Sequence, residues 1–508
     1  MCTTQLDAGN VLSRLFRTLF VTRHRKLPLP PGPRKLPVVG NLHQIPSSNP
    51  WRTYQQWHKQ YGPIITIKKG PGTTIILGSA KVAKDLLHDR GSIYSSRPHM
   101  YFIGECVFGG IQPSIMPYGP KWRLFHKVQM AFVNVNTAHA YRSLQALESQ
   151  QLLRDLTESD DFTKAFERHS TSLLYTLAYG KRIMTGKEEE IRDLEELGGI
   201  LEKVLLEAAR YQLSDMFPIL NSLPPFLAPW KRSGQALFAQ HKQLLEKHMK
   251  LALEAPNWNW CKQAQRLGAT TSISATELAF VLGGLFEASM TTPMVLDVFV
   301  MASVLNPQAV LRAQAELDVV VGPDRLPSFE DKAHLPFMDA FIREVMRWRP
   351  ITPGGFEHAV TQDDEYMGYH IPKGATVVAN HWSIDLDDTI FNEPHEFKPE
   401  RWIEQPNLPL ATFGYGRRAC PGRHIGLNSL YSVISCVLWA YDIEHAFDSG
   451  VRLEIDEWDM TQGADSKPSP FKASFRVRSQ KHRDVIERES LVSDKMFELI
   501  LNSISASF

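Results

Sequence analysis

The chain has 508 residues, of which 43% are hydrophobic, and its formal net charge at pH 7 is only +1. This composition excludes a disordered chain, and the charge balance gives no reason to expect a nucleic-acid partner. The five cysteines are scattered, with no Cys-x-x-Cys pair, which argues against a disulfide framework or a structural zinc site and fits a reducing compartment. Because no repeat, low-complexity linker or central block of like charge divides the sequence, we expect one large domain.

Residues 1–26 carry apolar side chains at helical spacing, with basic residues interleaved and following. The stretch is too short and too charged for a spanning helix, which needs about 20 mostly apolar residues. It also lacks the apolar core and cleavage site of a secretory signal. We expect a basic amphipathic helix that lies in a membrane interface; the alternative is a short helix packed on the protein's own surface. The prolines of residues 27–42 predict an extended, stiff hinge between this anchor and a catalytic domain over residues 43–478.

Strand and helix patterns divide the rest of the chain unevenly. The stretches "PIITIKKG" and "TTIILG" are rich in β-branched residues and flank a Pro-Gly turn, which predicts a β-hairpin. From about residue 79 to 348 helical periodicity dominates, and strand character returns in "DEYMGYHIPKGATVVAN". The chain is therefore predicted to be mainly α with a small β portion. Residues 479–508 form a C-terminal extension with an apolar helical stripe and no assignable role.

The stretch "FGYGRRACPGRHIG", Phe413 to Gly426, places one cysteine, Cys420, among glycines and arginines. A proline favours a helix start, so the thiol precedes a helix whose free N–H groups and dipole can stabilise a thiolate. The glycines let a flat ligand approach the backbone, and Arg417 and Arg418 can bind carboxylates. Together these features describe a seat for haem with sulfur on iron. The plainer alternative is a buried structural cysteine in a glycine-rich turn.

Five residues of this stretch fit the pattern F-x-x-G-x-R-x-C-x-G: Phe413, Gly416, Arg418, Cys420 and Gly422. On these residues the sequence resembles the cytochrome P450 family, and other stretches extend the resemblance over nearly the whole length. It implies the cytochrome P450 fold and a haem b cofactor whose iron has Cys420 as its axial ligand. The five residues are then expected to bind that cofactor.

The stretch "REVMR" places Glu344 and Arg347 three residues apart, on one helical face. Such a pair is usually a surface ion pair of little energetic value. Followed by Arg401 in "FKPERW", however, it matches the E-x-x-R motif and the later arginine of the family. The resemblance implies a buried network behind the haem that positions the cysteine loop, and burial of these charges is tolerable only when all are paired.

The stretch "PYGPKWRLFHKV" is similar to the family's W-R-x-x-R helix, which binds a haem propionate. Trp122 matches the tryptophan, and His126 occupies the second basic position, so this contact can depend on pH. By their positions, His358 and Arg418 are further propionate candidates.

In this family the helix across the distal haem face carries a small residue, glycine, any residue, an acid and then threonine. The aligned residues are Ala288, Ser289, Met290, Thr291 and Thr292. The family's acid and threonine deliver the protons for cleavage of the O–O bond, so Thr291 and Thr292 are the catalytic candidates. Pro293 removes a hydrogen bond to Ser289, which predicts an opened helix. Glu287 lies on a different helical face and is expected to be structural.

The resemblance predicts a haem-thiolate monooxygenase that inserts one oxygen atom from O2 into a hydrophobic intermediate of fungal secondary metabolism. The missing acid leaves open a haem-thiolate enzyme of oxidative coupling, dehydration or rearrangement without net oxygen insertion. An alternative from another class is a non-catalytic haem-binding sensor. Thr292 and a long apolar substrate region argue against that sensor. The expected substrate-facing residues are Phe102, Phe108, Ile115, Ala288, Phe356 and Phe471.

Electrons are expected to come from NADPH through a separate NADPH-cytochrome P450 reductase, because the chain has no phosphate-binding glycine loop and no room for a flavin domain. Five basic residues provide a surface for such an acidic partner, or simply a solvated charged face: Lys121, Arg123, Lys127, Arg417 and Arg423. We expect the protein at the cytosolic surface of the endoplasmic reticulum membrane, with peripheral membrane contact.

Overall fold

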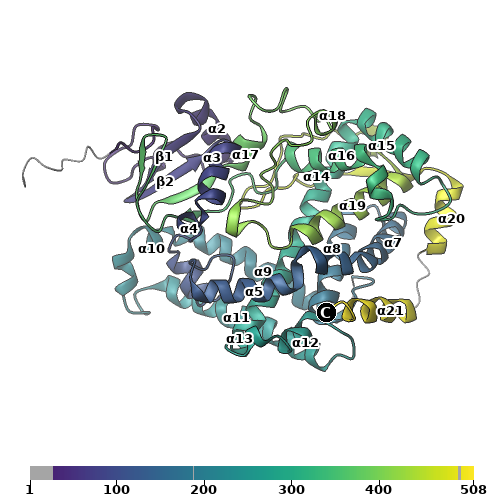
Figure 1. The fold of residues 1–508 in the computed structure, drawn as a ribbon, viewed down its shortest axis with the longest axis horizontal. Coiled ribbons are helices and arrows are strands. Elements are labelled where there is room, and N and C mark those ends of the chain that lie inside the picture. Colours follow the sequence, from purple (N-terminus) through teal and green to yellow (C-terminus); the bar gives the residue numbers. More distant parts are fainter. Residues whose placement is uncertain (1–26, 187, 490–493) are drawn as a thin grey trace, which may run out of the picture.

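The computed structural model of the chain describes residues 27–186, 188–489 and 494–508, so the predicted interfacial helix in residues 1–26 lies outside the described residues. Helices predominate in the described part, and its strands form small sheets (Figure 1). The prediction of a mainly α fold with a small β portion is confirmed. The sheet-rich part lies at one end of the molecule and most helices lie at the other (Figure 1).

The β-branched runs after residue 62 form the predicted hairpin, in which β1 (Ile64–Lys69) pairs antiparallel with β2 (Gly72–Leu77). Strand β2 then pairs in parallel with β6 (Thr376–Ala379), a strand about 300 residues later in the chain. Strand β6 in turn pairs antiparallel with β3 (His358–Ala359), giving the order β1-β2-β6-β3. Three two-stranded sheets complete the β portion: β4 (Asp364–Tyr366) with β5 (Tyr369–Ile371), β7 (Tyr441–His445) with β10 (Ala473–Val477), and β8 (Phe447–Asp448) with β9 (Val451–Arg452).

The helical part has apolar faces that pack into two large clusters of buried side chains. Its longer helices are α5 (Pro120–Val133), α7 (Arg142–Glu158), α8 (Phe162–Tyr179), α9 (Glu189–Arg210), α11 (Pro229–Glu254), α13 (Ala275–Glu287), α14 (Thr291–Leu305), α15 (Pro307–Val320), α16 (Pro336–Trp348) and α19 (Arg423–Ala440). Its shorter helices are α6 (Val135–Ala140), α10 (Gln212–Met216), α12 (Trp260–Gln265) and α18 (Glu400–Glu404). Beside the sheet lie α2 (Pro50–Tyr61), α3 (Ala80–Ala83), α4 (Gly91–Tyr94) and α17 (His381–Asp385).

One helical run of the described chain, Ala275–Leu305, is long and apolar enough to cross a membrane. However, 67% of its most apolar window is buried inside the protein, where it belongs to both large clusters. Its apolar composition therefore reflects a core position. The run is broken by a 3-10 turn at Ala288–Met290, which separates α13 from α14.

The proline-rich segment 27–42, predicted to be an extended, stiff hinge, is hydrogen-bonded to neighbouring strands. The carbonyl of Pro31 accepts a hydrogen bond from the N–H of Thr66 in β1 (2.8 Å), and the carbonyl of Pro28 accepts one from His370 (2.8 Å). A Cβ at Gly32 would lie 2.1 Å from the Thr66 carbonyl oxygen, so the two backbones touch. The carbonyls of an extended proline-rich segment are not paired within the segment. Here they accept hydrogen bonds from the N–H groups of neighbouring strands.

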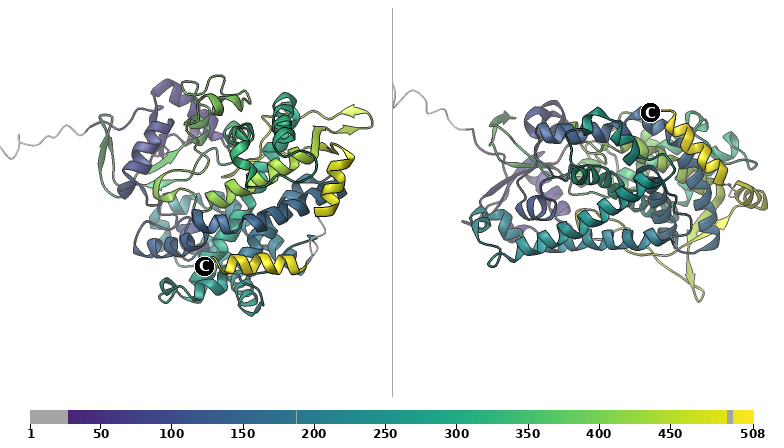
Figure 2. Two further views of the ribbon diagram at one scale, coloured as in Figure 1. Left: turned by 45° about the vertical axis from the view of Figure 1, so that its right-hand side comes forward. Right: turned by 90° about the horizontal axis from the view of Figure 1, so that it is seen from below.

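The C-terminal residues 479–508 pack on the helical part and are not a loose appendage. They form α20 (Gln480–Glu489) and α21 (Asp494–Ser505), shown in yellow in Figure 2, at the end of the molecule away from the sheet. Val485 and Ile486 of α20 and Leu501 of α21 are buried in the two large clusters. The boundary predicted at residue 478 is therefore not a boundary of the core.

Candidate active site

Cys420 lies in an irregular loop that ends where α19 begins, three residues later. Its backbone N–H donates to the carbonyl of Phe413 (2.8 Å), which closes the loop on itself. Gly416 has φ +62°, and a Cβ there would lie 2.0 Å from the carbonyl oxygen of Leu87. Only glycine fits this position, so the glycine of the motif is explained by a close approach to another part of the chain.

The Cys420 thiol lies on a cavity but is poorly solvated. Burial raises the pKa of the thiol, while the backbone N–H of Gly422 and the charge of Arg423 lower it. The predicted stabilisation of a thiolate by the helix start is present, but burial outweighs it. A metal cation bonded to the sulfur would reverse this balance.

The cavity has a volume of about 390 Å³ and is lined both by the cysteine loop and by the junction of α13 and α14. This volume is within the usual range for a site that takes a small organic molecule. Most of the predicted cofactor residues line it: Phe413, Arg418, Cys420, Gly422, Trp122, His126 and His358. Gly416 does not, because it packs against Leu87.

Two half-buried arginines face this cavity without a carboxylate partner. The guanidinium of Arg418 lies 4.2 Å from the ring centroid of Trp122 and donates to three backbone carbonyls. Arg97 donates to the carbonyls of Ser114 and Glu357. Burial lowers the pKa of Arg418 to about 9 and that of Arg97 to about 10, so both are charged at neutral pH.

Neither guanidinium pairs with a carboxylate of the described residues, so both cations are available to bind an anionic ligand. The cavity, its free cysteine and these two cations fit a haem with its two propionates. The sequence gives little warning of Arg97, because a single Arg-Pro pair in "SSRPHM" has neither periodicity nor a motif partner nearby.

The two histidines expected near the propionates differ in what they can offer. The ring of His126 stacks on Trp122 (centroids 4.6 Å apart), and burial together with the charge of Arg418 lowers its pKa, so the ring is neutral at physiological pH. Burial also lowers the pKa of His358 to about 3, and its Nδ1 donates to the carbonyl of Tyr94 (2.8 Å). Its Nε2 therefore presents a lone pair, and the arginines are the better anion donors.

The predicted charge network is present and fully buried. Glu344 accepts two hydrogen bonds from Arg347 (2.9 and 2.7 Å) and one from Arg401 Nε (3.1 Å). The indole N–H of Trp402 and the backbone N–H of Lys398 donate to the same carboxylate (both 2.9 Å). Every lone-pair direction of the carboxylate is thus used, which is the condition for burying it.

A chain of contacts links this network to the cysteine loop. Arg347 Nη1 donates to the backbone carbonyl of Asp385, the last residue of α17 (2.9 Å). The Asp385 side chain accepts from the N–H of Ala411, where the loop begins (2.9 Å). Thr412 donates to the carbonyl of Met346 in α16 (3.3 Å). The loop is therefore positioned from behind by α16 and α17.

At the junction of α13 and α14, where Pro293 predicts an opened helix, the backbone changes from α-helical to 3-10 geometry. Residues 288–290 form a 3-10 turn, and the hydroxyl of Thr291 donates to the carbonyl of Ala288 (2.9 Å). Thr291 and Thr292 both line the cavity. The Thr292 hydroxyl makes no hydrogen bond to the described residues, so it is free to bond a ligand or water.

Glu287, one residue before this turn, is engaged elsewhere. Its carboxylate lies 2.5 Å from Nε2 of the buried His241 in α11 and accepts from the amide of Gln112 (3.1 Å). It therefore ties α13 to α11, in agreement with the structural role expected for it, and does not replace the missing acid beside Thr292.

Only two of the six expected substrate residues, Ala288 and Phe356, line the cavity. Phe102 packs on Tyr211 (5.3 Å between centroids), because residues 101–107 form a π-helical turn against α11. The other three are also packing residues: Phe108 contacts His241 (5.5 Å), Phe471 contacts Phe162 (5.3 Å) and Ile115 packs against the cluster that contains Phe102 and Phe108. The sequence missed a polar lining residue, Asp465.

Comparison with known proteins agrees with this geometry. The family model described as Cytochrome P450 matches residues 30–472. The chain is 53% identical to the cytochrome P450 monooxygenase FrzL of a Cladobotryum species over 486 residues, 96% of this chain and 94% of that protein. It is 45% identical to the cytochrome P450 monooxygenase aneD of Aspergillus aculeatus over 493 residues, 96% of each protein. It is 41% identical to peniB of Penicillium patulum over 94% of this chain and 89% of that protein.

Replacement of Glu344 by glutamine should abolish haem retention and lower the free energy of unfolding by about 3–5 kcal/mol, because two buried guanidiniums lose their counter-charge. Haem content after purification and urea unfolding of the variant measure the two effects. A matched control is Glu400→Gln, since Glu400 pairs with Arg312 at the surface and should cost less than about 1 kcal/mol. A Glu344→Gln protein that keeps its haem at the control's level would contradict the structural role of the network.

Proposed function

The chain belongs to the cytochrome P450 family, and from this premise we propose that it is a haem-thiolate monooxygenase acting on a hydrophobic intermediate of fungal secondary metabolism. It is an oxidoreductase of the monooxygenase type, as its relatives are named. The proposal adds the reaction: insertion of one atom of O2 into an organic substrate, with electrons that come from NADPH through a separate reductase.

One observation carries the proposal: the free Cys420 lies on the same cavity as Thr292 and as two arginines that lack an anion. When bound, haem b would supply activation of O2, and the Cys420 sulfur would hold its iron. Arg97 and Arg418 would hold the propionates, and Trp122 would pack beside them.

The residues of the α13–α14 junction suit the handling of protons. Thr292 has a free hydroxyl on the cavity, so it can pass a proton from water to the reacting oxygen. The Thr291 hydroxyl donates a hydrogen bond to the Ala288 carbonyl, and it is not an acid that could supply a proton to the reacting oxygen. Proton supply therefore depends on water or substrate, which also favours a second candidate function: coupling, dehydration or rearrangement without oxygen insertion.

Isotope labelling tests the reaction once a substrate is in hand. A strain that lacks this protein should accumulate the substrate, and the purified protein with reductase and NADPH should convert it. Under heavy-isotope oxygen gas, insertion places one labelled atom in the product. An unlabelled product with altered bonding would instead establish the second candidate.

The basic surface on the cysteine side fits an acidic reductase. The guanidinium groups of Arg123 and Arg417 both lie over the ring of Tyr118, 5.7 and 5.4 Å from its centroid, and Lys127 and Arg423 are exposed nearby in sequence. Lys121 is committed to an ion pair with Glu277 (2.7 Å) and contributes less. We assign the docking surface to Arg123, Lys127, Arg417 and Arg423.

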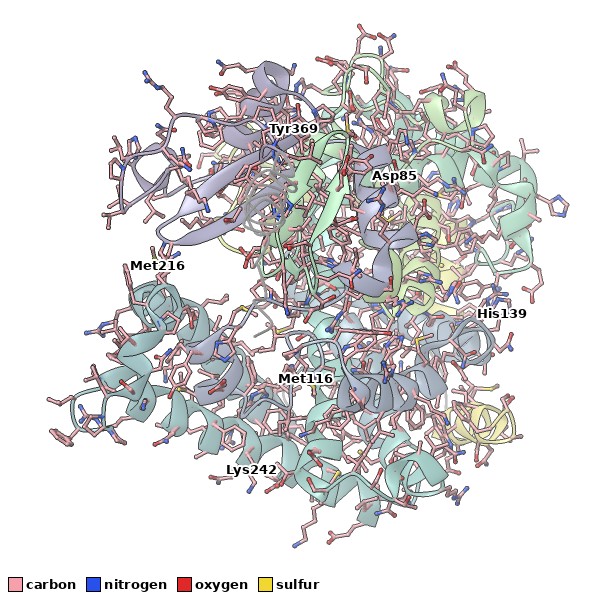
Figure 3. All side chains as sticks on the ribbon, turned by 60° about the vertical axis from the view of Figure 1, so that its left-hand side comes forward. Asp85, Met116, His139, Met216, Lys242 and Tyr369 are labelled. Atoms are coloured by element: carbon pink, nitrogen blue, oxygen red, sulfur yellow. The ribbon has the colours of Figure 1, made fainter. Side chains whose placement is uncertain are left out.

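Peripheral membrane contact has a candidate surface within the described residues. Met216, labelled in Figure 3, reaches the turn of the β1–β2 hairpin, where its Cε lies 2.6 Å from the position that a Cβ of Gly70 would take. The segments that precede the hairpin and follow Met216 in the chain carry exposed apolar side chains: Leu36, Val38, Val39, Phe217, Ile219, Phe226 and Leu227. We propose that this surface, together with residues 1–26, rests on the membrane.

Replacement of Thr291 by aspartate restores an acid beside Thr292 and should speed NADPH-driven oxygen activation by about tenfold, because it supplies a proton that the native residue cannot. Turnover and hydrogen peroxide release per NADPH measure the effect. Thr291→Asn is the matched control, with the same shape and no acidic proton. Equal turnover and equal peroxide release in both variants would reject this account of the proton path.

Reversal of two charges, Arg123→Glu with Lys127→Glu, should slow electron delivery from the NADPH reductase by about tenfold at low salt, while chemical reduction by dithionite stays unchanged. Stopped-flow absorption of the haem follows both reactions. Lys250→Glu with Lys472→Glu changes the net charge equally at exposed positions elsewhere. If both pairs slow the reaction alike, the docking surface is assigned wrongly.

Aspartate at Ile219 and Phe226 should weaken binding to phosphatidylcholine vesicles by about tenfold, because two exposed apolar side chains of the proposed surface become charged. Vesicle flotation measures the bound fraction. The control places aspartate at Val319 and Leu499, which are equally exposed but far from this surface. Binding that falls equally in both proteins would count against a defined membrane-facing surface.

A further inference from the structure

Asp465 brings a carboxylate to the wall of the active-site cavity, on a loop of defined shape. The loop joins β9 to β10, and the N–H of Thr461 donates to the carbonyl of Lys467 across its neck (2.7 Å). The N–H of Ser466 donates to the carbonyl of Ile351, another cavity residue (2.7 Å). The residues on both sides of Asp465 are thus fixed, which limits where its side chain can go.

The same loop is attached to the distal helix. Lys467 Nζ lies 3.5 Å from Oδ2 of Asp297 in α14 and 3.9 Å from Glu167. Asp297 lies five residues after Thr292 and two after Val295, and both of these line the cavity. The loop that carries Asp465 is therefore tied to α14, the helix that carries Thr292 and Val295.

Asp465 has no partner for its charge. Its Oδ1 is buried without a hydrogen bond, and the carboxylate forms no hydrogen bond or ion pair with the described residues. The nearest cation in sequence, Lys467, is already paired with two other acids. Burial alone raises the pKa of Asp465 to about 6, so Arg97 and Arg418 are too distant to affect it.

A carboxylate removed from water without a partner costs several kcal/mol, so a folded protein normally pairs it, neutralises it or leaves it in solvent. Asp465 is half-buried and unpaired, and it lines the binding cavity. We propose that Asp465 anchors a substrate that carries a protonated amine, with the ammonium on the carboxylate and the apolar remainder along Val295 and Ile351. This inference rests on the proposed function, since it names the substrate class of the same site.

The chemistry favours a basic nitrogen over a neutral donor. Near neutral pH most of the carboxylate is ionised, and a charge-assisted N–H···O contact is roughly twice as strong as a neutral one. A substrate carboxylate is excluded from this wall by repulsion. The cavity thus accepts a basic alkaloid-type molecule and discriminates against a neutral hydrocarbon of the same shape.

The test uses haem-loaded full-length protein and two probes of one shape: N,N-dimethyl(phenylbutyl)amine and the hydrocarbon in which CH replaces its nitrogen. Calorimetry measures both affinities for the native protein, Asp465→Asn and Asp465→Glu. The amine should bind about tenfold more weakly to Asp465→Asn than to the native protein, and its affinity should be restored in Asp465→Glu. The affinity of the hydrocarbon should change less than about twofold. Asp448→Asn, an exposed acid outside the cavity, should leave both affinities unchanged.

Equal losses for the two probes, or no loss for either, would overturn the inference. If Asp465→Asn does not load haem, the test uses the two affinities of the native protein alone. The inference then requires that the native protein bind the amine more tightly than the hydrocarbon. The reduced, carbon-monoxide-bound spectrum is recorded on every sample. A thiolate-type spectrum with no amine preference rejects the anchor and leaves the proposed function intact, whereas a different spectrum in the native protein rejects the proposed function itself.

Discussion

The position of Cys420 depends on a carboxylate that has been withdrawn completely from water. Glu344 is shared by Arg347 and Arg401, and each partner keeps the others from being an unpaired buried charge. Loss of one member costs about 3–5 kcal/mol, against a total stability of about 5–15 kcal/mol for a typical domain. Arg347 donates a hydrogen bond to the backbone carbonyl of Asp385. The side chain of Asp385 accepts one from the N–H of Ala411, where the cysteine loop begins. An irregular loop is thus fixed by charges that cannot be exposed.

The cavity in front of that loop has two separate polar regions. Arg97 and Arg418 provide unpaired positive charge, which suits the propionates of a haem, while Asp465 provides unpaired negative charge on the wall of the distal helix. The same cavity is also lined by apolar side chains and by Thr292, whose hydroxyl is free. We propose that one region serves the cofactor and the other the substrate, and that proton supply comes from Thr292, from water or from the bound molecule because Thr291 stands where the family has an acid.

The parts of this arrangement that sequence reasoning reached are local in the chain. Glu344 and Arg347 stand one helical turn apart, and the cysteine motif occupies ten consecutive residues, so the resemblance to the family's motifs can be read from short stretches. Arg97 and Asp465 reach the same cavity from segments more than 300 residues apart, and no motif or periodicity in the sequence around either residue indicates that it lines a cavity. Phe102, Phe108 and Phe471 do not line the cavity as predicted, and the reason is different. An apolar residue has the same sequence pattern whether it lines a cavity or packs in the core.

Sulfur on iron is tested most directly by the absorption spectrum of the reduced, carbon-monoxide-bound protein, native and with Cys420→Ser. The native protein should give a thiolate-type spectrum, and the variant should lose both the spectrum and the haem. A histidine-type spectrum from intact native protein, or a serine variant that keeps its haem and its absorption bands, would contradict the assignment of Cys420 as the ligand.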